Sequence, residues 1–101
     1  RERRHAAHNG MMFVAFALDS KNRLASIVEV RGLGLAYEDD DVISDQLEAI
    51  CQSVAKAIKA IPVEARDEDE SVEIVVARIV KKAAQAIWGR RPIVETIILR
   101  T

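Results

Sequence analysis

The longest uninterrupted apolar run in the chain covers Met11 to Leu18. Eight residues are short for a helix, and the run lies between two pairs of turn-forming residues, Asn9-Gly10 and Asp19-Ser20. The run therefore predicts a β-strand. Both alternating sets of its side chains are apolar, so this strand should be covered on both faces and should lie at the centre of a sheet.

Two more strands are predicted on either side of a helical region. Residues 19–23 predict a hairpin loop, because Asp and Asn side chains bond to nearby backbone amides. Residues 24–31 then predict the returning strand, and Gly32 and Gly34 interrupt the pattern after it. Near the other end of the chain, residues 92–100 are rich in β-branched side chains and predict the last strand.

The first predicted helix runs from about Val42 to Pro62. Three aspartates, Asp39 to Asp41, precede it and should cap and stabilise its positive end, while Pro62 ends it. Its apolar residues recur at helical spacing and form one stripe, which consists of Ile43, Leu47, Ile50, Cys51, Val54, Ile58 and Ile61.

A second helix is predicted after an acidic, solvated linker at residues 63–70. Ser71 is its expected N-cap and Gly89 its stop signal. Its buried stripe consists of Val72, Val75, Val76, Ile79, Val80, Ala83 and Ile87.

The expected fold is an α/β (α+β) two-layer sandwich in the order β-β-α-α-β. One domain at residues 10–101 is expected, with residues 1–9 forming the end of a linker or a lead-in helix, because the length suits a single domain. The chain begins with Arg1 rather than Met, so it is expected to be a piece of a longer protein. The pattern leaves open the direction of the last strand and the sheet face that the helices cover.

Two packed helices cover only one face of a three-stranded sheet, because the sheet is narrow. One alternating set of the apolar strand is then left without cover. We expect a second copy of the domain, or the remainder of a longer chain, to cover this face. The expected self-association face consists of Met11, Phe13, Ala15 and Ala17.

Charge is unevenly distributed along a chain whose formal net charge is -1. Residues 1–31 carry six basic and three acidic side chains, residues 32–73 carry three and twelve, and residues 74–101 carry six and one. Long-range steering follows the summed field, so a polyanion covering the whole surface is not expected. A local basic patch built from the two ends stays open as an alternative.

The candidate for such a patch is a polar stripe on the second helix and in the turn after it. It is interpreted either as a site of contact with nucleic-acid phosphates or as an ordinary solvated helix face. Trp88 beside it should pack at the helix end, although base stacking is the alternative. The candidate RNA-contact residues are Arg78, Lys81, Lys82, Arg90 and Arg91.

The remaining reactive residues do not form a catalytic or metal-binding pattern. His5 and His8 lack the third ligand that zinc normally requires. Cys51 lies on an apolar helix stripe and has no activating motif around it, so a buried structural thiol is expected. Neither acidic cluster, at residues 38–41 and 67–70, has the spacing of a calcium loop. We therefore expect this chain alone to be non-catalytic and to hold no metal or cofactor.

Membrane insertion and an internal disulfide are both excluded by the sequence. No apolar run approaches the ~20 residues that span a bilayer. The chain has one cysteine, which cannot form an internal disulfide and which suits a reducing cytoplasm.

The order of helix, hairpin, two helices and strand is also that of type II KH domains. Those domains need a glycine-rich clamp between their helices to hold RNA, whereas residues 62–70 are acidic and contain no glycine. Four short segments show a closer similarity to another family. They are Asn9-Gly10 before an apolar strand, the turn at Asp19, the strand end Arg31-Gly32-Leu33, and residues 89–94, which read Gly-Arg-Arg-Pro-Ile-Val. With the basic helix ahead of this Arg-Arg-Pro turn, the chain from about Arg3 resembles the C-terminal domain of bacterial ribonuclease J.

This resemblance implies a parent enzyme of the metallo-β-lactamase/β-CASP family that degrades and matures RNA in the cytoplasm, internally and from the 5′ end. Two divalent metal ions, zinc or similar, would act in the parent's β-lactamase domain, and no catalytic or metal residue carries over to this chain. The resemblance implies an accessory domain that forms a homo-oligomer (a dimer) and contacts the nuclease domains of its own chain, with RNA bound through the parent. The alternative is an autonomous RNA-binding module that uses the basic helix face, against which the acidic middle third of the chain argues.

Overall fold

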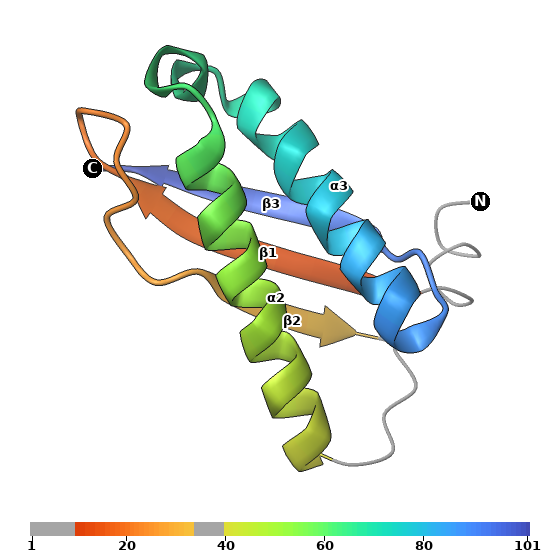
Figure 1. Ribbon diagram of the computed structural model, residues 1–101. Helices are drawn as coiled ribbons and strands as arrows, with labels where there is room; N and C mark the ends of the chain where they lie inside the picture. The colour runs from red at the N-terminus through yellow and green to blue at the C-terminus, as the bar shows by residue number, and fades with distance from the viewer. Residues whose placement is uncertain (1–9, 34–39) are drawn as a thin grey trace.

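The computed structural model describes residues 10–33 and 40–101, with side chains described for residues 10–32 and 45–101. Its strands are β1 (Met11–Leu18), β2 (Glu29–Leu33) and β3 (Ile93–Arg100). Its helices are α2 (Asp40–Ala60), a short 3-10 helix η1 (Val63–Asp67) and α3 (Asp69–Trp88). This element order, shown in Figure 1, confirms the predicted β-β-α-α-β arrangement.

The three strands form one mixed sheet in the order β2-β1-β3. Strand β2 runs antiparallel to β1, and β3 runs parallel to it, with Met11 beside Ile93 and Leu18 beside Arg100. A parallel neighbour requires a long crossover connection, and the two helices supply it. The predicted central position of the apolar strand is confirmed.

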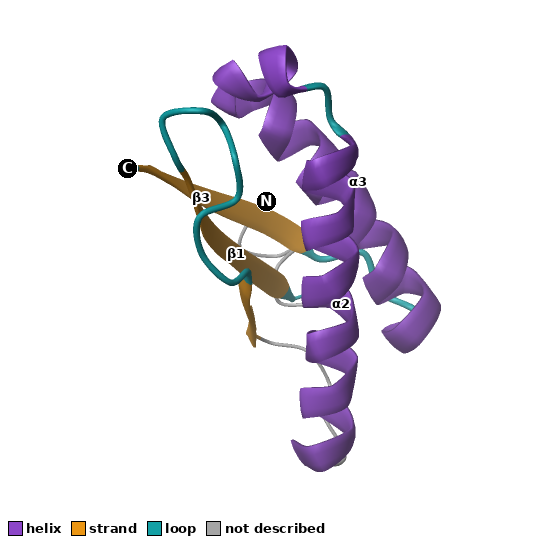
Figure 2. Ribbon diagram, turned by 60° about the vertical axis from the view of Figure 1, so that its left-hand side comes forward, coloured by secondary structure: helices purple, strands orange, loops and turns teal. Residues whose placement is uncertain are grey.

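Both helices lie on the same side of the sheet, as Figures 1 and 2 show. The even-numbered side chains of β1 point toward them and are buried, namely Met12, Val14, Phe16 and Leu18. The helices contribute buried residues at a spacing of four, namely Ile50, Val54 and Ile58 from α2 and Val72, Val76, Val80 and Ala84 from α3, and Ile61 just beyond the end of α2 is buried with them. One core therefore fills the space between the two layers.

The helix ends follow the sequence signals at their C-termini better than at their N-termini. Helix α2 ends at Ala60, two residues before Pro62. Gly89 follows α3 in a left-handed conformation, with a φ of 67°, and its N–H donates to the Gln85 carbonyl at 2.9 Å. The predicted N-cap Ser71 is wrong: α3 begins at Asp69, because the acidic segment before Ser71 is itself helical over η1 and the first turn of α3.

The second strand was predicted to begin five residues too early and to end two residues too early, because β2 extends through Gly32 to Leu33. In the observed register Ala15 pairs with Glu29. If this register continued, Ser26 would lie opposite Leu18, but Leu18 forms its bridge with Leu24 instead. Two extra residues therefore bulge out of the ladder. The Ser26 hydroxyl accepts the Ala17 N–H at 2.8 Å, and Ile27 is left 75% exposed although its apolar side chain had suggested a strand position.

Several sequence predictions fall outside the described residues. These are the lead-in segment at residues 1–9 with His5 and His8, the bend at Gly34, and the cap at Asp39. The side chains of Asp40, Asp41 and Ile43 are also outside the described set.

Two arginines connect the ends of the elements at one end of the molecule. The guanidinium of Arg66 is buried and donates to the carbonyls of Ile61, Asn22 and Lys59, each at 2.9 Å. Arg100, at the end of β3, donates to the Asn22 Oδ1 at 2.8 Å and forms an ion pair of 2.6 Å with Asp69. The β1–β2 connection, η1 and the end of β3 are thereby held together.

Candidate functional site

The sheet face turned away from the helices is an apolar strip bordered by charges. The odd-numbered side chains of β1 lie on it, beside the odd-numbered side chains of β3. Phe13 lies between Arg31 of β2 and Glu95 of β3, and Arg31 forms an ion pair of 3.2 Å with Glu29. We call this surface the outer sheet face, and its apolar residues are Met11, Phe13, Ala15, Ala17, Ile93, Ile97 and Leu99.

The residues predicted for this face are less exposed than Ile97 and Leu99 of β3. Met11, Phe13 and Ala15 are partly exposed, and Ala17 is buried with only 8% of its surface accessible. In contrast, Ile97 and Leu99 are 51% and 58% exposed. Neither residue was predicted for this face. The alternation of Ile93, Glu95, Ile97 and Leu99 places both on it once β3 is known to lie beside β1.

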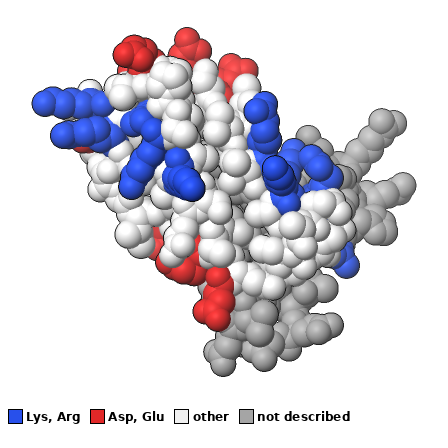
Figure 3. Space-filling view, viewed as in Figure 1, with Lys and Arg blue, Asp and Glu red and all other residues white. Residues whose placement is uncertain are grey.

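The opposite side of the molecule, formed by the helices, carries most of the described basic side chains. Figure 3 shows Lys and Arg gathered over the two helices and the β1–β2 connection. Three of the predicted RNA-contact residues share one stripe of α3, with Arg78 and Lys82 exposed and Lys81 partly exposed. Lys56 and Lys59 of α2 are exposed too, although they were not among the predicted RNA-contact residues.

The other two predicted RNA-contact residues lie apart from this stripe. Arg90 and Arg91 follow Gly89 in the turn that leads to β3, and Arg90 is only partly exposed. Lys56 and Lys59 lie near the C-terminal end of α2, whose neighbour α3 runs back in the opposite direction. The turn is therefore at the opposite end of the helix layer from these lysines.

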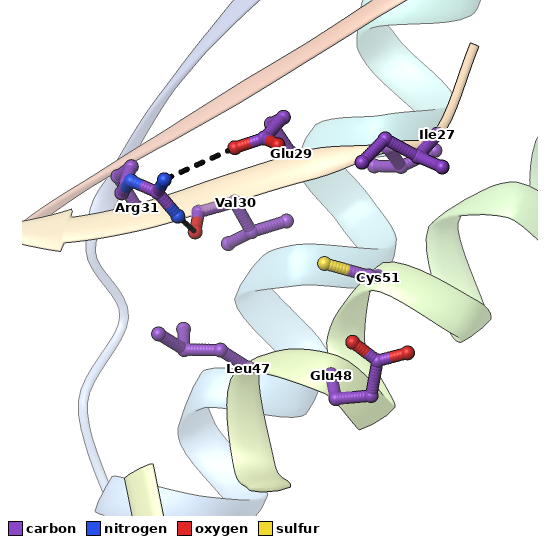
Figure 4. Close-up of a pocket in the computed structure, with 8 residues that line it drawn as sticks. Ile27, Glu29, Val30, Arg31, Leu47, Glu48 and Cys51 are labelled. Atoms are coloured by element: carbon purple, nitrogen blue, oxygen red, sulfur yellow. Dashed lines mark hydrogen bonds and ion pairs between the residues drawn. The ribbon is translucent and has the colours of Figure 1, made fainter. Parts of the chain in front are cut away.

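A groove between β2 and α2 contains the one cysteine of the chain. The groove has a volume of about 230 Å³, and Figure 4 shows Cys51 facing Val30 and Ile27, with Glu48 and Leu47 on the same helix. Burial raises the pKa of the Cys51 thiol, and the nearby Glu48 carboxylate raises it further, while a hydrogen bond from the Val30 backbone opposes the change. A thiol of raised pKa is a poor nucleophile near neutral pH, which agrees with a structural role.

We expect Cys51 to react at least tenfold more slowly with a disulfide reagent such as DTNB at about pH 8 in the folded chain than in urea. The folded state holds the thiol proton more tightly than the unfolded chain, so the same shift lowers stability as the pH rises above the ordinary value of 9.0. Glu48→Gln should increase the folded-state rate, because it removes a neighbouring negative charge. Equal rates in the folded and unfolded chains would contradict this prediction.

The described residues show neither a metal cluster nor a membrane-spanning helix. Within residues 10–33 and 40–101, no three or more His, Cys, Asp or Glu side chains are grouped so that they could hold a metal ion. In the same part of the chain, no helix is both long and apolar enough to cross a membrane. The residues described therefore do not fit the two-metal centre that the resemblance implies for the parent enzyme.

The whole chain matches a known protein family. The family model of the ribonuclease J C-terminal domain matches residues 1–101. The chain belongs to this family. The ribonuclease J C-terminal domain is thus an α/β two-layer sandwich in this chain, with two chemically different outer surfaces.

A curated relative places the domain within a larger protein. The ribonuclease J of Sinorhizobium meliloti is 26% identical over 99 residues, which cover 98% of this chain. The matched segment is only 17% of the length of that relative. The domain therefore corresponds to a small part of the protein it resembles.

Proposed function

We propose that this ribonuclease J C-terminal domain is a non-catalytic accessory domain that supports a nuclease core through self-association. The outer sheet face is the observation that carries this proposal. An apolar strip on two neighbouring strands, interrupted on β3 only by Glu95, has the composition of a protein contact surface rather than of a solvated sheet face.

Strand β3 gives the outer sheet face a second means of association. It is eight residues long, and within the described residues its far edge has no neighbouring strand. An unpaired edge strand presents free N–H and C=O groups that a second strand can pair with. A second copy of the domain that packs against the outer face and beside β3 would cover both the apolar side chains and this edge.

The parent protein supplies the chemistry in this proposal. The nuclease core would lie in the part of the protein that this chain does not cover, and it would use two divalent metal ions to cleave RNA from the 5′ end and internally. RNA decay and processing in the cytoplasm would be its role. The domain's partners would then be a second copy of itself and the nuclease domains of its own chain.

We expect the double substitution Ile97→Lys with Leu99→Lys to convert an associated chain into a monomer. Both side chains are more than half exposed, so the new charges perturb the isolated fold little but would be desolvated in a dimer. Light scattering over a concentration series should then give the 11.2 kDa mass of one chain for the variant and about twice that mass for the unsubstituted chain.

Val63→Lys provides the matched control. Val63 is an exposed apolar residue of η1, on the side of the helices and away from the outer sheet face. Its substitution should leave the mass of the dimer unchanged at both low and high salt. A monomeric unsubstituted chain at all concentrations would argue instead that the nuclease domains of the same protein cover this face.

A further inference from the structure

We propose that the helix side of the domain binds the phosphodiester backbone of RNA. The binding surface, which we call the basic helix surface, consists of Lys56 and Lys59 of α2 and Arg78, Lys81 and Lys82 of α3. It lies across the molecule from the outer sheet face, since both helices cover the other side of the sheet (Figure 2). The proposal therefore goes beyond self-association and assigns a second function to a separate surface.

The cations of this surface are available for a ligand. Four of the five side chains are exposed, and Lys81 is partly exposed. Among the residues that the structure describes, none of the five forms an ion pair, whereas Arg23, Arg31 and Arg100 are each paired with a carboxylate. Unpaired surface cations keep their full attraction for an anion, because no neighbouring carboxylate has to be displaced first.

The acidic residues whose side chains the structure describes lie away from this surface. Figure 3 shows the Asp and Glu side chains above and below the basic groups on the helix side. The helix connection carries Glu64, Asp67 and Glu68 at one end, and the N-terminal half of α2 carries Asp45 and Glu48 toward the other. The described acidic residues of the middle third, which argued against RNA contact, therefore lie toward the two ends of the helix layer.

The residues around the cations suit a phosphate backbone better than a protein partner. The exposed neighbours on α2 include Gln52, Ser53 and Ala60, and those on α3 include Gln85 and Ala86. Protein interfaces depend on large aromatic or aliphatic anchors. The large exposed apolar residue of α3, Ile74, instead lines a hollow beside β3. Phosphate contacts require only cations and small polar groups.

Base recognition is not expected from this surface. Among the described aromatic residues, Phe16 is in the core and Phe13 is on the outer sheet face. Trp88 packs against the core, and its indole Nε1–H donates to the Gln46 Oε1 at 3.1 Å. Without an aromatic platform, bases cannot stack on the helices, so binding should be independent of sequence and strongly dependent on salt.

The test is the affinity of the chain for a fluorescein-labelled single-stranded RNA of about 30 nucleotides, measured by anisotropy between about 50 and 200 mM salt. If three to five phosphates are neutralised, the slope of log K against log salt should be about -2 to -3.5. Lys56→Glu and Lys82→Glu should each weaken binding about threefold to tenfold, and the double variant more than tenfold.

Two controls test whether a loss of RNA affinity comes from the basic helix surface itself, rather than from a change in net charge or from damage to the helices. Arg31→Glu changes the net charge as much as Lys56→Glu but lies on the outer sheet face, so it should alter the affinity less than twofold. Lys56→Arg with Lys82→Arg keeps the charges and should keep the affinity. Three results would overturn the proposal. They are the absence of RNA binding at low salt, an equal loss of RNA affinity in Arg31→Glu, and competition by polyglutamate that is as effective as competition by unlabelled RNA. The Lys56 and Lys82 variants should keep the solution mass of the unsubstituted chain. Because Arg31 borders the outer sheet face, the affinity of Arg31→Glu is compared at a concentration where its solution mass equals that of the unsubstituted chain.

Discussion

Replacing Arg66 with Ala should destabilise the domain by about 3 kcal/mol, because three carbonyl groups lose a charged donor at once. Two of these carbonyls, of Lys59 and Ile61, lie at and just beyond the C-terminal end of α2, where backbone acceptors have no partner in the helix. The third belongs to Asn22 in the β1–β2 connection. The loss is expected as a lower midpoint in urea unfolding followed by circular dichroism.

Arg23 is the matched control for this prediction. Arg23 forms an ion pair at 2.9 Å with Asp19, but its side chain is largely exposed, so the pair adds little stability. Arg66→Lys should recover less than half of the loss, since one ammonium cannot reproduce three guanidinium bonds in a fixed geometry. A cost for Arg66→Ala no larger than that for Arg23→Ala would show that water replaces the three bonds.

The parts of the fold that could be predicted are those that depend on local sequence. Met11 to Leu18 forms a strand with the predicted bounds, because an eight-residue apolar run between turn formers has no competing arrangement. Gly89 ends α3, because the left-handed conformation there favours glycine. The helix stripes point into the core because their spacing matches the helical repeat.

The parts that could not be predicted depend on contacts between distant segments. The bulge before β2 arises where Leu24 bridges to Leu18 and the Ser26 hydroxyl bonds to the Ala17 amide, and no local pattern signals either contact. Arg66 appeared to belong to a solvated acidic linker, yet it is buried because the end of α2 and the β1–β2 connection both offer it carbonyl groups. Long-range partners of this kind are set by topology.

The two candidate surfaces could likewise be predicted only where they depend on local sequence. Sequence alternation identified β1 residues of the outer sheet face but missed Ile97 and Leu99, because the direction and position of β3 were open. The stripe of Arg78, Lys81 and Lys82 follows from helical spacing alone. Its neighbours Lys56 and Lys59 could join it only once α2 and α3 were known to lie side by side.

The two faces of β1 should respond differently to the same change. Phe16→Ala is expected to cost about 3–5 kcal/mol, because Phe16 is only 2% exposed and its removal leaves a cavity between the sheet and the helices. Phe13→Ala, on the outer sheet face, removes the same atoms from a partly exposed position and should cost about 1 kcal/mol in the isolated monomer.

Comparing Phe16→Ala with Phe13→Ala also tests whether the outer sheet face is a contact surface, because folding and association depend on different residues. Phe16→Ala should lower the urea midpoint at every protein concentration. Phe13→Ala should lower it mainly at concentrations where the unsubstituted chain is dimeric, since a dimer gains stability by mass action. Its dimer dissociation constant, measured by light scattering, should rise at least tenfold. Equal, concentration-independent losses in the two variants would mean that Phe13 is packed like a core residue within a single chain, and the outer face would then not be the site of self-association.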